Sequence, residues 1–174
     1  MTLSKNAKIV FIASVALAAL VVVFALLNRS YVEPRREAQR TGVFYFLADG
    51  ERHAVSREDI ESLSPFAIDA NYKTSGMPAQ NKTYRGVSLR AIAESLGIDI
   101  SAYGSVLFTA ADGYASVLSA GDALDSGNCY IVIEEGGLPL GTLEDGGVGP
   151  FMMILAHDAF SLRWCKYLLE VSLR

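Results

Sequence analysis

The chain has 174 residues, of which 51% are hydrophobic and 20% charged, and its formal net charge at pH 7 is −4. This length allows one domain with a short appendage. The charge is unevenly distributed: residues 1–40 hold six Lys or Arg and two Asp or Glu, a net of +4, whereas the rest hold nine and seventeen, a net of −8. The acidic main part lacks the basic patch that nucleic-acid binding requires, so we exclude nucleic acid as a partner.

An unbroken apolar run from Ile9 to Leu27 follows a short tail, residues 1–8. As a helix the run would cover about 28 Å, close to the roughly 30 Å hydrocarbon core of a bilayer. A buried helix of this length normally shows a polar face, and Ser14 is the only polar residue here. The pattern predicts a transmembrane helix over residues 9–27 that anchors the chain in the cell membrane.

A cleaved signal peptide is the alternative interpretation of this run. Its apolar region is usually shorter and is followed by small residues, whereas this run ends in Leu26 and Leu27 and continues with Asn28 and Arg29. We therefore favour an uncleaved signal anchor with a single pass. The cations after the run would place the main domain in the cytoplasm, but the two lysines before it resemble the start of an export signal. We expect the soluble domain to lie outside the cytoplasm.

Residues 28–41 are polar, charged and interrupted by Pro34, which predicts a linker. Beyond it, apolar runs bounded by turn residues predict strands. These are expected over residues 42–47, 51–55, 66–72, 105–109, 115–118, 129–133, 151–155 and 168–173. A loop is expected over residues 73–82, a short helix or loop over 121–128, and a helical or irregular segment over 160–167.

Short helices are expected at two places. Ser56 and Asp59 form a capping-box-like start for a helix to about Leu63, and Arg90–Leu96 shows helical spacing with Gly97 as its terminator. Many strands with a few short helices, and no regular alternation of strand and helix, predict an α+β domain.

The most informative stretch runs from residue 128 to residue 167. Its two apolar strands, Cys129–Ile133 and Phe151–Leu155, are joined through glycine-rich backbone that includes residues 145–150. Such backbone suits a site where amides approach a ligand closely, and it suits an ordinary hairpin with a long loop equally well. The pattern alone favours the hairpin.

Several kinds of active site are excluded by the residues present. His53 and His157 are the only histidines, which rules out a histidine-rich metal site, and no G-x-S-x-G motif indicates a hydrolase triad. There is no P-loop, and residues 145–150 lack the third glycine and the following helix of the dinucleotide fingerprint. Cys129 and Cys165 are too far apart for a CxxC motif, so two buried free thiols are expected.

Four motifs, taken in order, resemble one known family. They are Tyr84-Arg85-Gly86-Val87-Ser88-Leu89 before an amphipathic helix, Asp112-Gly113-Tyr114 after a strand, Gly146-Gly147-Val148-Gly149-Pro150 before an apolar strand, and Trp164-Cys165-Lys166-Tyr167-Leu168 near the end. In this order and spacing they resemble the oxidoreductase molybdopterin-binding domain, the sulfite oxidase fold, over residues 42–174. The resemblance implies a β-rich α+β domain and a cofactor-binding site made of Asp112, Gly113, Tyr114, Gly146, Gly147, Gly149 and Lys166.

The chain departs from this family at two positions that carry the family's chemistry. A cysteine thiolate ligates molybdenum in the family, because soft anionic sulfur suits the oxidised metal. That cysteine would fall near Asp69–Tyr72, where none is present. Met152 stands where the family has a cofactor-contacting arginine, and the loss of a bidentate donor weakens an anion site. Lys166 still matches the family's closing lysine, so the resemblance implies a retained fold with a degraded active centre.

Two hypotheses follow from the resemblance. In the first, the chain is a membrane-tethered, non-catalytic binding or accessory module beside a redox or transport system, with a protein partner there. In the second, it is a small molybdopterin-dependent oxidoreductase with atypical ligation, in which a hydroxyl or amide group such as that of Asn71 lies near the metal. The missing thiolate favours the first hypothesis, and no catalytic or metal-ligating residue is predicted. A structural membrane protein whose tyrosines line a partner surface is a third class.

Overall fold

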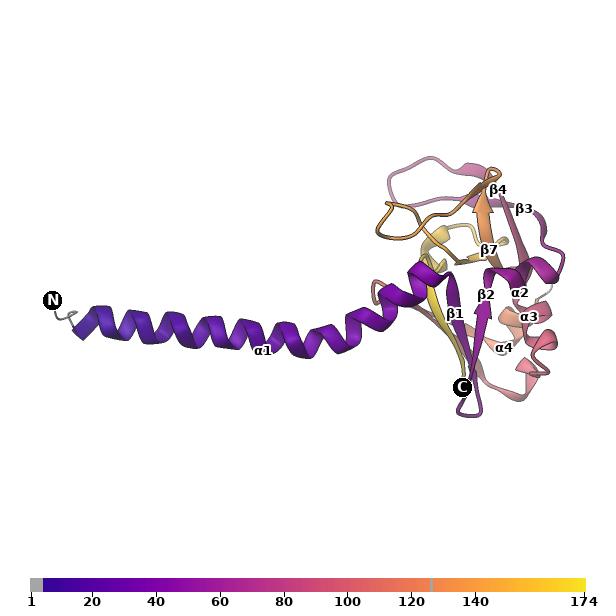
Figure 1. Cartoon of the computed structure of the whole chain (residues 1–174). Coiled ribbons are helices and arrows are strands. Elements are labelled where there is room, and N and C mark those ends of the chain that lie inside the picture. Colours follow the sequence, from indigo (N-terminus) through magenta and orange to yellow (C-terminus); the bar gives the residue numbers. More distant parts are fainter. Residues whose placement is uncertain (1–4, 126) are drawn as a thin grey trace. The chain divides into compact units, whose positions relative to one another are not determined.

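The computed structural model describes residues 5–125 and 127–174. Contacts divide the chain into two compact units, Met1–Glu37 and Ala38–Arg174. Most of helix α1, Lys5–Thr41, belongs to the first unit, and the second contains the strands and the short helices (Figure 1). Residues 1–4 of the predicted tail lie outside the described part, as does residue 126 of the segment predicted over 121–128.

Helix α1 continues through the segment that was predicted to be a linker. Pro34 lies inside it, although proline removes one backbone donor and crowds the preceding turn. Within the described residues, no single helix has both the length and the apolar character for a membrane span. Both criteria are satisfied only by a bent pair of helical segments, Phe11–Leu27 and Val32–Thr41. The two segments are bent by 42° relative to each other. Pro34 thus lies within helical backbone, and the role of residues 28–41 as a linker or stalk stays a prediction.

The first sheet has the strand order β2-β1-β10-β5-β6. Its strands are β1 (Val43–Ala48), β2 (Glu51–Ser56), β5 (Ser105–Ala110), β6 (Ala115–Ser119) and β10 (Leu168–Leu173). Two hairpins, β1–β2 and β5–β6, are joined by β10, which runs parallel to β1 and antiparallel to β5. The outer strand β6 exposes three uncharged side chains, Ala115, Val117 and Ser119.

The second sheet has the order β3-β4-β7-β8, and β9 also pairs with β7. Its strands are β3 (Phe66–Tyr72), β4 (Gln80–Ser88), β7 (Cys129–Glu135), β8 (Leu138–Pro139) and β9 (Met152–Leu155). Strand β4 is a correction: its start at Gln80 lies in the predicted loop over 73–82, and no strand was expected as far as Ser88. The polar first half of β4 has no apolar alternation, and its pairing with β3 over the whole length of β3 makes it a strand.

The short helices lie in the connections between strands. They are α2 (Arg57–Ser62), α3 (Leu89–Ser95), α4 (Ala120–Leu124), and the 3₁₀ turns η1 (Ile100–Ala102) and η2 (Ser161–Arg163). The capping box predicted at Ser56 is confirmed: its hydroxyl accepts from the amide of Asp59 at 3.2 Å, and its own amide donates to the Asp59 carboxylate at 2.7 Å.

Side chains of both sheets share one hydrophobic core. Phe44 of β1 meets Phe151, beside β9, edge to face at 5.0 Å between ring centres. Gly86 permits a close approach of β4 to β7, because a Cβ atom there would lie 2.2 Å from the carbonyl oxygen of Ile131. The predicted α+β, β-rich class is confirmed for the described part of the second unit.

Candidate functional site

Three of the residues implied by the family resemblance meet in one pocket of about 240 Å³. They are Asp112 and Tyr114, from the turn between β5 and β6, and Lys166, which lies shortly before β10. Its other lining residues are Ser161, Leu162 and Trp164, from η2 and the residue that follows it. The pocket therefore forms where the β5–β6 turn meets the segment that leads into β10.

The turn that carries Asp112 and Tyr114 is held by hydrogen bonds at both residues. The Tyr114 amide donates to the Asp112 carboxylate at 2.9 Å, an Asx-type turn, and the Tyr114 hydroxyl donates to the Leu162 carbonyl at 2.6 Å. Gly113, between them, has a φ of 92°, which suits glycine. Gly113 shapes the turn and does not line the pocket, whereas Asp112 and Tyr114 do.

Lys166 lines the same pocket, and its ammonium is hydrogen-bonded to a neutral partner. Its ammonium donates to the Tyr72 hydroxyl at 3.2 Å, and none of the described residues forms an ion pair with it. The next residue, Tyr167, has a φ of 54°, a region that a bulky side chain rarely adopts. Tyr167 is held there because its amide donates to Val148 and its carbonyl accepts from Ala111, both at 2.9 Å. These contacts fix the backbone next to Lys166.

Aromatic rings pack behind the pocket. Trp164 is 4% exposed, and its indole N–H donates to the Leu155 carbonyl at 3.1 Å. The rings of Tyr72 and Tyr84 lie 5.8 and 5.6 Å from that of Trp164. Burial raises the pKa of Tyr84 far above its ordinary value, and the nearby Glu135 raises it further, so Tyr84 stays protonated. Packed aromatic rings thus support the pocket from behind.

The three glycines Gly146, Gly147 and Gly149 are not among the lining residues of this pocket. Their amides donate within their own loop, from Gly146 to Leu143, from Gly147 to Thr142 and from Gly149 to Gly141. A Cβ atom at Gly147 would lie 2.2 Å from the carbonyl oxygen of Leu140, so this glycine lets two chain segments pack together. Cofactor binding by the three glycines stays a prediction.

The residues present do not fit a molybdenum atom held by a thiolate. Cys129 and Cys165 are buried free thiols, as expected, and neither lines the pocket. Burial raises the pKa of Cys165 to about 12, which disfavours the thiolate that would bind a metal. Met152 is buried in β9 opposite Val132. Among the described residues, no group of three or more His, Cys, Asp or Glu is placed to hold a metal ion.

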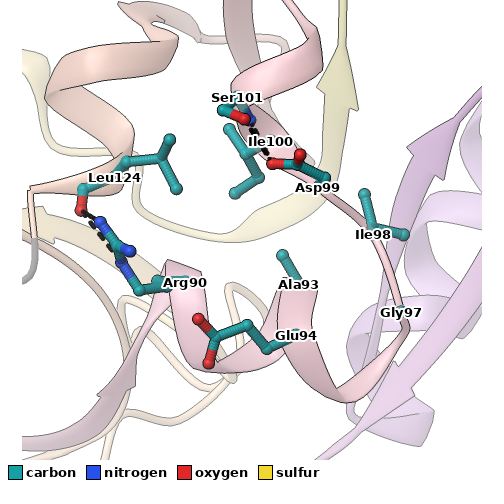
Figure 2. Close-up of a pocket in the computed structure, with 9 residues that line it drawn as sticks. All are labelled: Arg90, Ala93, Glu94, Gly97, Ile98, Asp99, Ile100, Ser101 and Leu124. Carbon is teal, nitrogen blue, oxygen red and sulfur yellow. Dashed lines mark hydrogen bonds between the residues drawn. The ribbon is translucent and has the colours of Figure 1, made fainter.

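A second pocket, of about 390 Å³, lies between α3, η1 and the end of α4 (Figure 2). The Arg90 side chain spans it and donates to the Leu124 carbonyl, with its closer nitrogen at 2.5 Å. The Asp99 carboxylate accepts from both the amide and the hydroxyl of Ser101. Because these polar groups bond within the fold, and no predicted site residue is present, we assign no function to this pocket.

Sequence reasoning missed part of the site. The sequence places Tyr72 near the position of the absent cysteine and among the tyrosines of a candidate partner surface, but not in this pocket region, and it singles out Trp164 only as part of the motif around Lys166. Ser161 and Leu162 lie in a segment whose regular structure could not be predicted, and no spacing or motif singles them out. They join the site because η2 turns back toward the β5–β6 turn, a long-range contact that the local sequence does not encode.

No family model and no curated protein matches the chain. Solved structures do match the fold, including that of the sulfane dehydrogenase SoxCD from Paracoccus pantotrophus. That likeness has a TM-score of 0.61 at 11% identity, and it covers 78% of this chain and 38% of the other. At such low identity it shows the fold alone. The likeness therefore supports the oxidoreductase-like fold that the sequence resemblance implies, as a distant relationship in fold.

Proposed function

We propose that the chain is a membrane-tethered, non-catalytic binding module that works beside a redox or transport system. The pocket carries this proposal: it holds Asp112, Tyr114 and Lys166 at the positions of the family's motifs, but no thiolate lines it. A pocket with fixed walls, one ammonium and one carboxylate can bind a polar molecule without performing redox chemistry on it. Fold likeness alone does not carry over an activity.

The tether and its placement are part of the same proposal. Ile9–Leu27 is the segment that would enter the membrane, because its side chains are apolar and those from Phe11 to Leu27 are exposed. An apolar helical surface of this extent needs a cover, and a bilayer supplies one. The two lysines before the run support a soluble domain outside the cytoplasm, where a membrane-bound partner would meet it.

The test is the metal and pterin content of the full chain, purified in detergent from a host that makes molybdopterin. We expect far less than one molybdenum per chain by mass spectrometry, and no pterin fluorescence after oxidative release. A molybdopterin enzyme purified from the same cells controls for cofactor supply. A stoichiometric content of molybdenum would overturn the non-catalytic assignment.

One observation favours the second candidate, a small molybdopterin-dependent oxidoreductase with an oxygen ligand. The Tyr72 hydroxyl lies 3.2 Å from the Lys166 ammonium, next to the pocket, whereas Asn71 is exposed and does not line it. If this candidate is correct, Lys166→Ala lowers cofactor content relative to the wild type. Equal and negligible content in both proteins would exclude it.

A further inference from the structure

Two opposite charges line the pocket without neutralising each other. The Lys166 ammonium and the Asp112 carboxylate both border it, yet neither forms an ion pair with any residue in the described part of the chain. Lys166 contacts the Tyr72 hydroxyl, and Asp112 accepts from the Tyr114 amide. A ligand with a single charge would satisfy one of these groups and face the other as a like charge. A ligand that carries both charges satisfies the two together.

The size of the pocket restricts this ligand to a small molecule. Its volume is about 240 Å³, below the roughly 300 Å³ at which pockets for drug-sized ligands begin. A water molecule takes up about 30 Å³ in the liquid, so the space holds on the order of eight non-hydrogen atoms. That is the size class of a free amino acid.

Apart from Ser161, whose hydroxyl donates to the Lys73 carbonyl at 2.8 Å, the remaining lining is largely apolar, and hydrogen bonds hold it in place before any ligand binds. Leu162 and Tyr114 are 64% and 41% exposed, and Trp164 is buried beside them. The Tyr114 hydroxyl is fixed on the Leu162 carbonyl, and the Trp164 indole is fixed on Leu155. An apolar group that covers Leu162 and Tyr114 removes apolar surface from water, at little cost in ordering the site.

We propose that this pocket binds a free α-amino acid with an apolar side chain, with its carboxylate at Lys166 and its ammonium at Asp112. The inference rests on the proposed function, since it names the ligand class of the same binding site. The apolar side chain of the ligand would lie against Leu162 and Tyr114.

The experiment titrates the full chain in detergent with leucine, N-acetyl-leucine and leucinamide by calorimetry. N-acetyl-leucine lacks the ammonium and leucinamide lacks the carboxylate, so each loses one of the two charge contacts. We expect leucine to bind at least about tenfold more tightly than either analogue. Equal affinities for all three compounds, or no binding of leucine at millimolar concentration, would overturn the proposal.

Two variants assign each charge to its partner. Lys166→Met should weaken leucine binding about tenfold, because the ligand carboxylate loses its partner, and should leave leucinamide binding no weaker, because the variant removes a like charge that faces the leucinamide ammonium. Asp112→Asn keeps an acceptor for the Tyr114 amide. It should weaken leucine binding and leave N-acetyl-leucine binding no weaker, because it removes a like charge that faces the ligand carboxylate. Lys73→Met is the matched control, since Lys73 does not line the pocket. The opposite pattern, or equal losses for all ligands in a variant that keeps its thermal midpoint, contradicts the assignment.

The two proposals fail in different ways. Stoichiometric molybdenum in the purified chain overturns the non-catalytic function. An empty chain that binds leucine no better than its analogues overturns only the amino-acid inference and leaves the module without an assigned ligand.

Discussion

Gly86 sets the distance between two strands at the centre of the second sheet. It lies where the pairing of β4 and β7 shifts register, between Arg85 and Gly86. A Cβ atom there would meet Ile131 oxygen at 2.2 Å and the Cα of Val132 at 2.7 Å, both backbone atoms that cannot turn aside. The residue is therefore a packing requirement of the fold, although the sequence motif around it was noticed for its resemblance to a family.

We predict that Gly86→Ala lowers the free energy of unfolding by about 1–3 kcal/mol, because the added methyl group forces the two strands apart. Urea denaturation measures the change. Gly121→Ala in α4 is the control, since the nearest atom to its new Cβ would be the Ser119 hydroxyl at 3.8 Å and alanine favours a helix. Equal stability of Gly86→Ala and the wild type would show that β4 and β7 are not this close.

The residue scale also shows where sequence reasoning succeeds. The Ser56–Asp59 capping box spans three residues, so its pattern is complete in the local sequence. Asp112 and Lys166 were found through the family resemblance, and they do line one pocket. The sequence could not predict that the amides of Gly146, Gly147 and Gly149 donate to carbonyls of their own loop. Their hydrogen-bond partners depend on the three-dimensional path of the loop backbone.

At the scale of elements, helix α2 is joined to the second sheet by charged side chains. Arg85 of β4 donates to Glu61 of α2 at 2.6 Å, and Arg57 of α2 donates to Glu134 of β7 at 2.9 Å. Arg85 also reaches Glu134 at 3.1 Å, so the four residues form one network. A network of several charges stabilises a fold more than an isolated surface ion pair does. The partial exposure of these side chains still limits the free energy that each pair contributes.

This network makes part of the stability depend on pH. The hydrogen bond from Arg85 lowers the pKa of Glu61 below its ordinary 4.5. Because the folded pKa lies below the unfolded one, the contribution of Glu61 is present above pH 4.5 and is lost as the pH falls through the lowered value. We predict that Glu61→Gln lowers stability by less than about 1 kcal/mol at neutral pH, with the difference closing under acid. The midpoints of urea denaturation, compared between Glu61→Gln and the wild type from neutral to acid pH, measure this difference in stability.

Glu58→Gln is the control for that series, because the Glu58 side chain is exposed and forms no hydrogen bond or ion pair with the described residues. A difference between Glu61→Gln and the wild type that stays constant with pH would show that Glu61 acts by packing and not by charge.

Element prediction succeeded where apolar periodicity was strong and failed where pairing alone makes a strand. The apolar runs of β5, β7, β9 and β10 were recognised from their composition. Strand β4 was missed because its first half, from Gln80, is polar, and its partners β3 and β7 are distant in sequence. The irregular residues 160–167 hold much of the pocket wall, and their path depends on contacts rather than on propensity.

At the scale of the whole molecule, the contacts separate an α1 unit from a sheet unit at Glu37–Ala38. We predict that deletion of residues 1–37 leaves the thermal midpoint unchanged, because the core of the second unit is complete without them. The same deletion should move the protein from the carbonate-resistant membrane fraction to the soluble fraction. Circular dichroism and fractionation beside the full chain provide the measurements.

A large fall in the midpoint on deletion would show that α1 supports the sheets. A full chain that carbonate extracts from the membrane would contradict the tether.

At this scale the fold class was predictable, since strand-rich patterning with short helices excludes a doubly wound sheet. The particular arrangement of the strands was predicted through the family resemblance and not from the strand pattern. The 11% identity to SoxCD shows that chains with few identical residues can share such a fold.

The open edge of the first sheet has a consequence for the behaviour of this protein in solution. Strand β6 offers its outer edge without a lysine, a proline or a bulge, the usual protections against edge-to-edge pairing. No side chain of β6 titrates, so its tendency to pair is independent of pH. The opposing repulsion comes from the net charge of −8 on residues 41–174, which acid removes. Colloidal stability is therefore governed by carboxylates outside the strand that needs protection.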